Sequence, residues 1–354
     1  MTMFVGIECI VGLASGWWLF ARLRMVPPLG NLTFAPEFSV VIPARNEAAN
    51  LPKLLLSMRL STAIAAEVIV VDDGSTDATS LIAREHGAVV LASQQLPAGW
   101  TGKTWGCWQG AEAATSNLLV FLDADCYFAR EGLTRMIEWT GGEADVALSV
   151  LPYHSTQCWY EELSLFFNLM MAAGTGSFGA AGEGKMFGQS LIIRKELYYK
   201  AGGHHAVRGE RLEHLAMSPH VLSAGGRVRT AAGRGVMSMR MFPEGYSQLL
   251  ESWKRSAAAG ASGTCVTDLL LAIVWLSGAM TVPVAMGFGL AWSAVGMYFL
   301  YAIQFGWIGR RLGAFRLLSA MAYPVPMLFY LVVFGLSLLA KRSGAQATWK
   351  GRQV

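Results

Sequence analysis

Two carboxylates separated by a single alanine, Asp123-Ala124-Asp125, follow an apolar run at residues 118–122. Carboxylates at this spacing can share a divalent cation with phosphate oxygens, because Mg²⁺ and Mn²⁺ prefer oxygen ligands and leave coordination positions open for a diphosphate. Such a cation would neutralise the charge that develops on a departing diphosphate. Taken alone, an Asp-x-Asp triplet is more often a turn or a solvated edge, so its meaning depends on its surroundings.

A second acidic pair, Asp72-Asp73, follows the apolar run at residues 68–71 and precedes Gly74-Ser75. Asp-Asp-Gly-Ser is also a good turn and helix-cap sequence. The two interpretations are compatible, because Gly74 and Ser75 can form the turn while Asp72 or Asp73 accepts hydrogen bonds from a base or a ribose. Acidic pairs placed after two separate apolar runs are a stronger signal than either pair alone.

The elements that position these pairs alternate between short apolar runs and helical patterns from residue 38 to about residue 263. This alternation is typical of βαβ units and predicts an α/β fold with a mostly parallel sheet. Ligands of such sheets bind beyond the carboxyl ends of the strands, so the polar clusters at residues 43–47, 72–75 and 123–125 should face one crevice. We expect strands at 39–42, 68–71, 88–91 and 118–122, and helices at 47–58, 77–86 and 104–114.

Three segments of the sequence resemble the amino-terminal signatures of family 2 glycosyltransferases with the GT-A fold. They are Val-Val-Ile-Pro-Ala-Arg-Asn-Glu at 40–47, Val-Ile-Val-Val-Asp-Asp-Gly-Ser-Thr-Asp at 68–77 and Phe-Leu-Asp-Ala-Asp at 121–125. The resemblance implies an inverting transfer from a UDP-sugar or a related donor, with Mg²⁺ or Mn²⁺. It implies donor binding by Pro43, Ala44, Arg45, Glu47, Asp72, Asp73, Asp123 and Ala124, with Asp123 on the ribose or sugar, and metal binding by Asp125 together with Asp123.

Further segments resemble one branch of this family, the carotenoid-acid or diaponeurosporenoate glycosyltransferases. These segments lie at 97–105, 202–209 and 239–245, and hopanoid-associated transferases share the Gly-Trp-Thr-Gly-Lys loop of the first one. The match implies that Lys103 serves the diphosphate as a point charge at a helix start. The alternative for Lys103 is an ordinary solvated loop lysine.

One position departs from the family pattern. Family members carry a Glu-Asp pair on a helix after the Gly-Gly-His segment, with the Asp as general base, whereas this chain has Glu213 and His214. Either His214 takes the catalytic role, which a pKa of about 6.5 permits, or Glu213 does, or the enzyme is impaired. A carboxylic-acid acceptor would already be ionised at neutral pH, since its reference pKa is about 4. Positioning would then matter more than proton removal.

Aromatic and histidine side chains near these motifs have competing interpretations. Three interpretations are open for the tryptophans of this region, which are Trp100, Trp105 and Trp108. Their rings could stack on a base, lie at the membrane interface or pack beneath the loop. No histidine spacing matches a known metal site, so we expect His204, His205 and His220 to be satisfied or exposed.

The composition bounds the class of protein. With 354 residues, 53% of them hydrophobic and only 15% charged, the chain is not expected to be purely soluble. The formal net charge of +4 is unclustered, which predicts no nucleic-acid partner and favours attraction to an anionic membrane surface. Five scattered cysteines without a Cys-x-x-Cys pair predict reduced thiols in a cytosolic setting.

Apolar stretches at both ends of the chain predict membrane segments. The first, at 4–20, is interrupted by Glu8 and followed by Arg22 and Arg24, which favours a retained span over a cleaved signal peptide. The second, at 269–309, has no charged residue and suffices for two helices of about 20 residues turning near 283–289. The third, at 317–340, predicts one further span.

The basic flanks of these segments predict an orientation. Basic residues follow the first span and the third span, which is the second helix of the 269–309 stretch. They place both of these flanks, and the domain between the first and second spans, in the cytoplasm. A fourth span would put the basic tail outside, whereas the charge of that tail argues for the inside, so the topology of the last span stays open.

These observations lead to one hypothesis for the chain. We expect an N-terminal transmembrane anchor at 1–24, a GT-A catalytic domain at 38–245, an amphipathic interfacial helix at 246–266 and about three transmembrane helices at 267–342. The enzyme would be a multi-pass protein of the cell membrane with its catalytic domain in the cytoplasm. It would transfer a hexose, with glucose expected first, from a UDP-sugar to a membrane lipid such as a carotenoid acid. The alternatives are a hopanoid or polyprenyl-lipid transferase, a catalytically impaired membrane scaffold and, more weakly, a nucleotidyltransferase.

Overall fold

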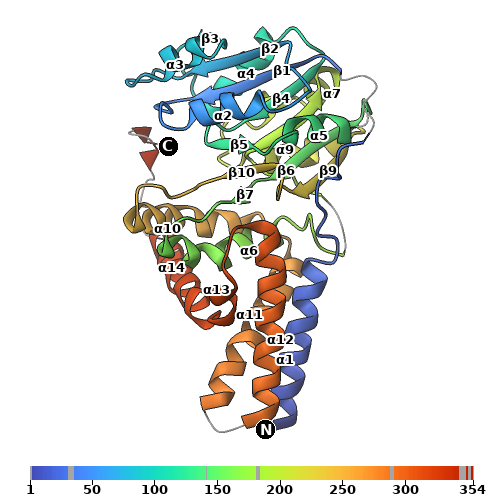
Figure 1. Cartoon of the computed structure of the whole chain (residues 1–354), viewed down its shortest axis with the longest axis vertical. Helices are drawn as coiled ribbons and strands as arrows, with labels where there is room; N and C mark the ends of the chain where they lie inside the picture. Colours follow the sequence, from blue (N-terminus) through green and yellow to red (C-terminus); the bar gives the residue numbers. More distant parts are fainter. Residues whose placement is uncertain are drawn as a thin grey trace. The chain divides into compact units, whose positions relative to one another are not determined.

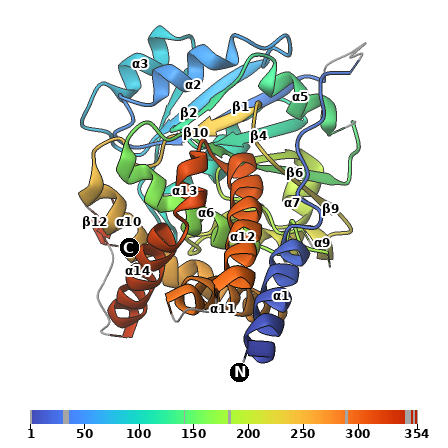
Figure 2. The same cartoon turned by 60° about the horizontal axis from the view of Figure 1, so that its bottom comes forward.

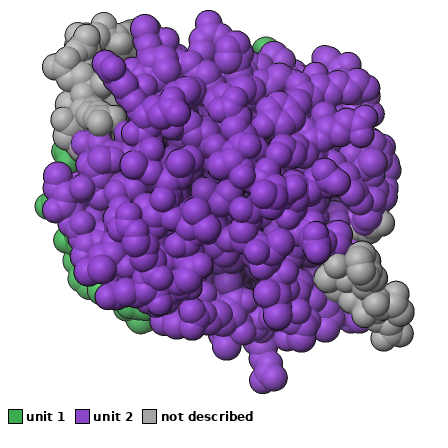
Figure 3. Space-filling model, turned by 90° about the horizontal axis from the view of Figure 1, so that it is seen from above, with its two compact units in different colours: residues 1–23, 154–183, 241–347 green, residues 24–153, 184–240, 348–354 purple. Residues whose placement is uncertain are grey.

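The chain forms two compact units, which are coloured separately in Figure 3. The computed structural model describes residues 2–30, 36–140, 142–180, 184–287, 291–342, 348–349 and 352–353. Unit 1 contains residues 1–23, 154–183 and 241–347, and unit 2 contains residues 24–153, 184–240 and 348–354.

A seven-stranded sheet in the order β3-β2-β1-β4-β8-β6-β9 is the centre of unit 2 (Figure 1). Strands β1 to β4 are mutually parallel, as are β6 and β9, whereas β8 is antiparallel to both β4 and β6. The prediction of a mostly parallel sheet is therefore confirmed. The strands are β1 Phe38–Ala44, β2 Glu67–Asp72, β3 Val89–Ala92, β4 Leu118–Leu122, β6 Val146–Leu151, β8 Ser190–Arg194 and β9 Arg227–Ala232.

Helices and short strands surround this sheet. The central strands are almost entirely buried and rich in branched aliphatic residues, as expected for a sheet covered on both faces. On one face, β1 and β2 pack against α4, and the buried cluster continues to α7, α8 and α9. The further elements are α2 Leu51–Met58, α3 Thr79–Glu85, α4 Gly102–Ala113, α5 Gly132–Trp139, α7 Lys195–Lys200, α8 Gly203–Ala206, α9 Glu213–Ser223, β5 Cys126–Phe128, β7 Tyr153–His154, β10 Met237–Met239, β11 Thr348–Trp349 and β12 Arg352–Gln353.

Two helices of unit 2 begin later than the sequence predicts. The helix expected from residue 47 begins at Leu51, because Asn46 takes a φ of 53° and the backbone amide of Glu47 donates to Thr79 Oγ1. The helix expected from residue 77 begins at Thr79, since Asp77 uses its carboxylate to accept hydrogen bonds from backbone amides. In both cases side-chain hydrogen bonds hold a turn where helical periodicity alone suggests a first helical turn.

Unit 1 is helical, and three of its helices pack together as α1, α11 and α12 (Figures 1 and 2). Polar atoms are paired between them: Tyr301 donates to Cys9 O at 2.8 Å, Gln304 donates to Leu13 O at 2.9 Å, and Trp275 donates to Gln304 Oε1 at 2.7 Å. Such pairing is typical of helices that share an apolar surrounding. The helices of unit 1 are α1 Thr2–Leu19, η1 Trp159–Ser164, α6 Leu165–Gly174, α10 Tyr246–Ser262, α11 Val266–Gly287, α12 Ala291–Leu312, α13 Leu317–Met321 and α14 Pro324–Arg342.

Among the described residues, one helix is long and apolar enough to cross a membrane, and it spans Val266–Gly287 with a mean hydropathy of 2.1. Shorter apolar helices span Phe4–Leu19 and Pro324–Ala340. Helix α11 continues through Pro283 to Gly287, beyond the start of the predicted turn, and residues 288–290 lie outside the described part. The N-terminal anchor and the number of C-terminal spans stay predictions.

The stretch at residues 317–340, in which the sequence predicts one further span, forms two helices in the structure, α13 and α14. The break falls at Ala322 and Tyr323, directly before Pro324. Proline has no backbone N–H to donate and restricts the residue before it, so a helix ends before Pro324 and a new one begins with it.

A glycine lets α4 approach the sheet in unit 2. A Cβ at Gly110 would lie 2.3 Å from Val41 Cγ1 and 3.2 Å from Val71 Cγ2. Both valines are buried strand residues, and a β-branched side chain has few alternative rotamers, so neither can move aside at low cost. Any side chain at position 110 would push α4 away from the strands that carry the polar loops.

We therefore expect Gly110→Ala to destabilise the protein by about 1–3 kcal/mol through overpacking. This exceeds the gain of about 1 kcal/mol in helix propensity on replacing glycine by alanine. The measurement is thermal unfolding of the detergent-solubilised protein, followed by tryptophan fluorescence. Glu112→Ala on the exposed side of the same helix is the control and should melt near the wild-type temperature. A Gly110→Ala variant that melts at or above the wild-type temperature would contradict the steric argument.

Candidate active site

The carboxyl ends of β1, β2 and β4 carry most of the predicted site residues in unit 2. Pro43 and Ala44 end β1, and Ala44 lies opposite Asp72 in the register of β1 with β2. Ala124 follows β4 and is 4% exposed. Because these strands are parallel neighbours, their polar loops leave the sheet at one edge.

The loops after β1 and β2 are joined by hydrogen bonds. Arg45 Nη1 donates to Asp73 O at 2.5 Å and lies 3.6 Å from Asp73 Oδ2. Asn46 Oδ1 accepts a hydrogen bond from the backbone amide of Thr76 at 2.8 Å, and the backbone amide of Asn46 donates to Ser75 Oγ at 2.9 Å. Asn46 makes these contacts in the left-handed region, which asparagine tolerates better than most residues.

The two carboxylates of the Asp72-Asp73 pair have different surroundings. Asp72 Oδ1 accepts from the Ser75 amide at 2.9 Å and Asp72 Oδ2 accepts from Ser80 Oγ, so Asp72 holds the turn. Asp73 lies against the start of α4, where a Cβ at Gly102 would be 2.6 Å from Asp73 Oδ2. Of the two alternatives for contact with a donor, this geometry favours Asp73.

Lys103 connects three separate segments of the site. Its Nζ lies 2.7 Å from Asp123 Oδ1 and 2.7 Å from Glu213 Oε1, and it donates to Gly188 O at 3.0 Å. Burial would lower the pKa of Lys103, but the two carboxylates raise it well above its usual range. Lys103 is therefore a charged residue of the site and not a solvated loop lysine.

Three carboxylates crowd the end of β4. Burial, together with the negative charges of Asp123 and Glu47, raises the pKa of Asp125 to about 7. A divalent cation placed among these groups would relieve the repulsion, so the donor set fits the predicted metal. Among the described residues no group of three or more His, Cys, Asp or Glu side chains is arranged to hold a metal. The remaining ligands would have to come from phosphate oxygens of a donor.

The two candidate bases on α9 lie in different environments. His214 is 2% exposed, its Nδ1 lies 3.1 Å from Phe187 O, and its ring packs 5.4 Å from that of His204. Burial, together with the positive charge of Lys103, lowers the pKa of His214 to about 3. His214 is thus a neutral core residue, whereas Glu213 reaches Lys103. Of the two alternatives, the geometry favours Glu213 as the residue that acts in the site.

The tryptophans of the loop before α4 pack on one another. The rings of Trp100 and Trp105 lie 5.0 Å apart, and His205 packs 5.6 Å from Trp100. Trp105 Nε1 donates to Gln94 O at 3.2 Å. These contacts agree with packing beneath the loop, one of the three interpretations of these tryptophans.

His205 and His220 agree with their sequence interpretation, whereas His204 agrees only in part, because its buried Nε2 has no hydrogen-bond partner among the described residues. His204 is buried and its Nδ1 lies 3.0 Å from Tyr198 OH, whereas His205 and His220 are exposed.

Three site residues were not singled out from the sequence. Asn46 connects two loops, Gly102 leaves room for Asp73, and Gly188 offers its carbonyl to Lys103. Asparagine after a strand is a usable signal for a left-handed turn, and glycine at a helix start is a weaker signal for close approach. Every residue type has the same main-chain carbonyl, so nothing in the sequence indicated that Gly188 would accept a hydrogen bond from Lys103.

Known proteins resemble the chain over most of its length. Residues 39–206 match the profile described as Glycosyl transferase family 2. Over 330 residues the chain is 32% identical to the 4,4'-diaponeurosporenoate glycosyltransferase of Staphylococcus aureus (strain USA300), covering 89% of this chain and 87% of the relative. This chain belongs to glycosyl transferase family 2. The family predicted from the motifs is confirmed, and the protein is a glycosyltransferase.

A solved structure shares the architecture. A mannosyltransferase from Pyrobaculum calidifontis, in complex with GDP-Man and Mn²⁺, aligns with a TM-score of 0.55 at 16% identity over 97% of this chain and 100% of that chain. Glucosyl-3-phosphoglycerate synthase from Mycobacterium tuberculosis aligns with a TM-score of 0.47 at 21% identity over 68% of this chain and 88% of that chain. The likeness to the mannosyltransferase confirms the GT-A α/β fold.

The ion pairs of Lys103 generate a stability prediction. Lys103→Met leaves Asp123 and the buried Glu213 without their shared cation, and we expect a loss of about 3 kcal/mol in the free energy of unfolding. Adding Glu213→Gln should return part of this loss, because a neutral amide needs no cation. Thermal unfolding of the wild type, both single variants and the double variant measures the coupling. Purely additive losses would contradict a direct interaction between Lys103 and Glu213.

The buried imidazole of His214 generates a pH prediction. Its pKa is about 3 in the folded state and 6.5 ordinarily, so between these values only the unfolded chain takes up the proton. The contribution to stability is complete above about pH 6.5 and is lost progressively as the pH falls toward 3. We expect His214→Asn, whose amide can donate to Phe187 O, to melt with a smaller dependence on pH between 4 and 6.5. A slope equal to that of the wild type would contradict a neutral buried His214.

Proposed function

We propose that this glycosyltransferase inverts the anomeric centre while moving a hexose, glucose in particular, from a UDP-sugar to a carotenoid acid in a membrane. The observation that carries the proposal is the meeting of Asp73, Lys103, Asp123, Asp125 and Glu213 at one edge of the sheet. The name of the relative from Staphylococcus aureus supports the carotenoid-acid acceptor.

The donor would lie across the loops after β1, β2 and β4. Arg45 and Asp73 are linked to each other and would bind the nucleoside, with Glu47 nearby. Lys103 already contacts two carboxylates and a carbonyl. Since an ammonium group has three donors, Lys103 can reach the diphosphate only by giving up one of these partners. We assign it first to positioning Asp123 and Glu213, and then to the diphosphate when the donor is bound.

Asp125 and Asp123 would hold a divalent cation. The crowding that raises the pKa of Asp125 supports this assignment, as does the Mn²⁺ bound to the mannosyltransferase of the same fold. When bound, Mg²⁺ or Mn²⁺ would neutralise the charge that accumulates on the departing nucleoside diphosphate.

The acceptor chemistry explains how the chain can function without the usual aspartate base. A carotenoid acid with a pKa of about 4 is ionised at neutral pH, so its oxygen needs no deprotonation. In a single displacement, this carboxylate oxygen forms a bond to the anomeric carbon as the bond from that carbon to the diphosphate oxygen breaks. The products are a glycosyl ester and UDP. Glu213 would then orient the site through Lys103, and His214 would remain a neutral core residue.

A membrane location would bring the enzyme to such an acceptor. The apolar helices α1, α11 and α12 would cross the bilayer, with Arg310 and Arg311 ending α12 on the cytoplasmic side. The amphipathic segment 246–266 contains α10, and it would lie at the interface. The catalytic unit would then meet UDP-sugars in the cytoplasm.

The test is transfer of labelled glucose from UDP-glucose by the full-length protein in liposomes containing a carotenoid acid, with Mn²⁺ or Mg²⁺. We expect a glycosyl ester, its loss on chelation, and a fall of about 100-fold or more in kcat for Asp125→Asn. Glu85→Gln on the exposed side of α3 is the matched control and should keep full activity.

Other outcomes of this test point to the alternatives. Transfer to a hopanoid or a polyprenyl phosphate, without transfer to the carotenoid acid, would overturn the acceptor assignment. Donor binding without any transfer would indicate the inactive scaffold. A His214→Asn enzyme with unchanged turnover beside a slow Glu213→Gln enzyme would agree with a structural His214 and a functional Glu213.

A further inference from the structure

Helices α13 and α14 of unit 1 form a hairpin beside α12. Helix α13 packs against α12, and α14 packs against α10, η1 and α6. In Figure 1 the hairpin accompanies only part of α12, whereas α1, α11 and α12 extend further together. The chain reverses at Ala322 and Tyr323, where Pro324 begins α14.

Contacts of the reversal show how far the hairpin reaches along α12. The ring of Tyr323 lies 4.8 Å from that of Tyr298 and 5.1 Å from that of Phe305, and Tyr298 OH donates to Met321 O at 2.6 Å. At a rise of 1.5 Å per residue, Phe305 and Tyr298 lie about 8 and about 18 Å from Arg310, near the end of α12. A hydrocarbon core is about 30 Å thick. The reversal therefore lies near half the depth of a bilayer that α12 would cross.

From this reversal α14 returns toward the arginine end of α12. Tyr330 packs 4.9 Å from Phe167 of α6. Helix α6 in turn meets the end of α12, where a Cβ at Gly309, next to Arg310, would lie 2.8 Å from Leu165 Cδ1 of α6. Helix α14 thus leads back to the level at which the chain entered the hairpin, and it does not continue alongside the far half of α12.

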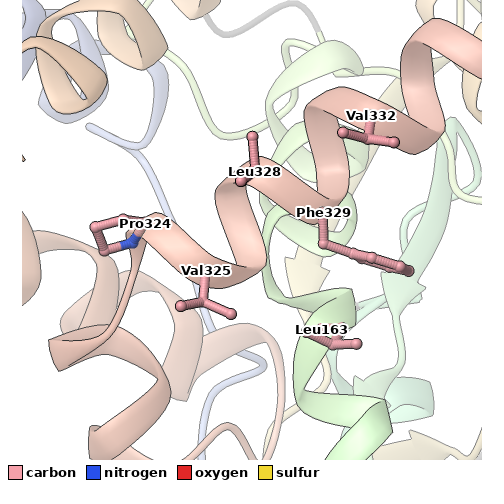
Figure 4. A pocket seen from close by; sticks show the side chains of 6 residues that line it. All are labelled: Leu163, Pro324, Val325, Leu328, Phe329 and Val332. Carbon is pink, nitrogen blue, oxygen red and sulfur yellow. The ribbon is translucent and has the colours of Figure 1, made fainter.

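The outward side of α14 is apolar along its length. Val325, Leu328, Val332 and Leu339 are 61%, 56%, 54% and 63% exposed and follow helical spacing. Between η1 and α14 lies a groove of about 470 Å³, shown in Figure 4. Its lining contains no charged side chain: Leu163, Pro324, Val325, Leu328, Phe329 and Val332. Soluble surfaces rarely expose a continuous apolar patch of this kind.

We propose that α13 and α14 form a re-entrant hairpin that enters one leaflet and returns, with the hydrocarbon chains of that leaflet against the groove and the outward side of α14. Arg316 begins the hairpin and Lys341-Arg342 end it, so basic residues mark both ends on one side. The chain then crosses the membrane three times, with α1, α11 and α12, and not four times. The basic C-terminal tail therefore lies on the same side of the membrane as the catalytic unit. The inference rests on the membrane placement proposed above.

Cysteine labelling in the full-length membrane protein tests the topology. In a background with Cys158→Ser and Cys265→Ser, single cysteines are placed at Lys200 in unit 2, at Gly287, the last residue of α11, and after Val354. A membrane-impermeant maleimide is applied to intact cells and to inverted vesicles. We expect Lys200→Cys and the C-terminal cysteine to react from one side and Gly287→Cys from the other. A C-terminal cysteine that reacts from the side of Gly287→Cys would overturn the hairpin.

A matched pair of leucines tests the contact with hydrocarbon. Leu328 on α14 and Leu81 on α3 are 56% and 57% exposed, so without a covering partner their cysteine variants should react equally. We expect Leu328→Cys to react at least 10-fold more slowly than Leu81→Cys with the impermeant reagent from either side, and at the same rate as Leu81→Cys after full denaturation. Equal rates in the native membrane would overturn the proposed contact.

The two proposals fail in distinguishable ways. If Gly287→Cys reacts from the same side as Lys200→Cys, α11 and α12 do not cross the bilayer and the hairpin fails with them. Transfer of labelled glucose by the same preparations shows separately whether the proposed reaction stands.

Discussion

One ammonium group placed between two carboxylates holds the catalytic edge of this protein together. Lys103 lies in the first turn of α4, Asp123 follows β4 and Glu213 begins α9, so a single charge joins three elements that are distant in sequence. Glu213 is almost completely buried, and such a carboxylate is stable only with a partner. The position of the α9 helix start therefore depends on Lys103, and the close approach of α4 to the sheet depends on glycines 102 and 110.

The same arrangement explains how a departure from the family pattern can be tolerated. His214 stands where the resemblance to the family predicts an aspartate, and its side chain packs against Phe187 O and His204. On α9 the charge that reaches the site is that of Glu213, one residue earlier, and Lys103 pairs with it. In the reaction proposed above the acceptor is already ionised, so this arrangement would have to orient the acceptor and would not have to remove a proton from it.

Much of the catalytic unit is predictable from sequence because its signals are local. Periodic apolar runs located β1, β2, β3 and β4, and the polar residues after them identified the edge of the sheet. The helix starts at Leu51 and Thr79 were missed because hydrogen bonds between separate loops decide them. The partners of Lys103 were missed because pairing over long sequence separations leaves no periodic signal. The break before Pro324 had a local signal, the proline itself. The prediction of a single span gave more weight to the high hydropathy of residues 317–340 than to this proline.

The reversed direction of β8 has a consequence for how this site can change over time. Because β8 is antiparallel to β4, the residues that enter it lie at the catalytic edge, where the carbonyls of Phe187, Gly188 and Gln189 meet His214, Lys103 and the Asp123 amide. Peptide groups are the same for every amino acid. Substitutions at these three positions can therefore reshape the walls of the site while the polar contacts beneath it persist, which gives this edge room to adapt to different acceptors.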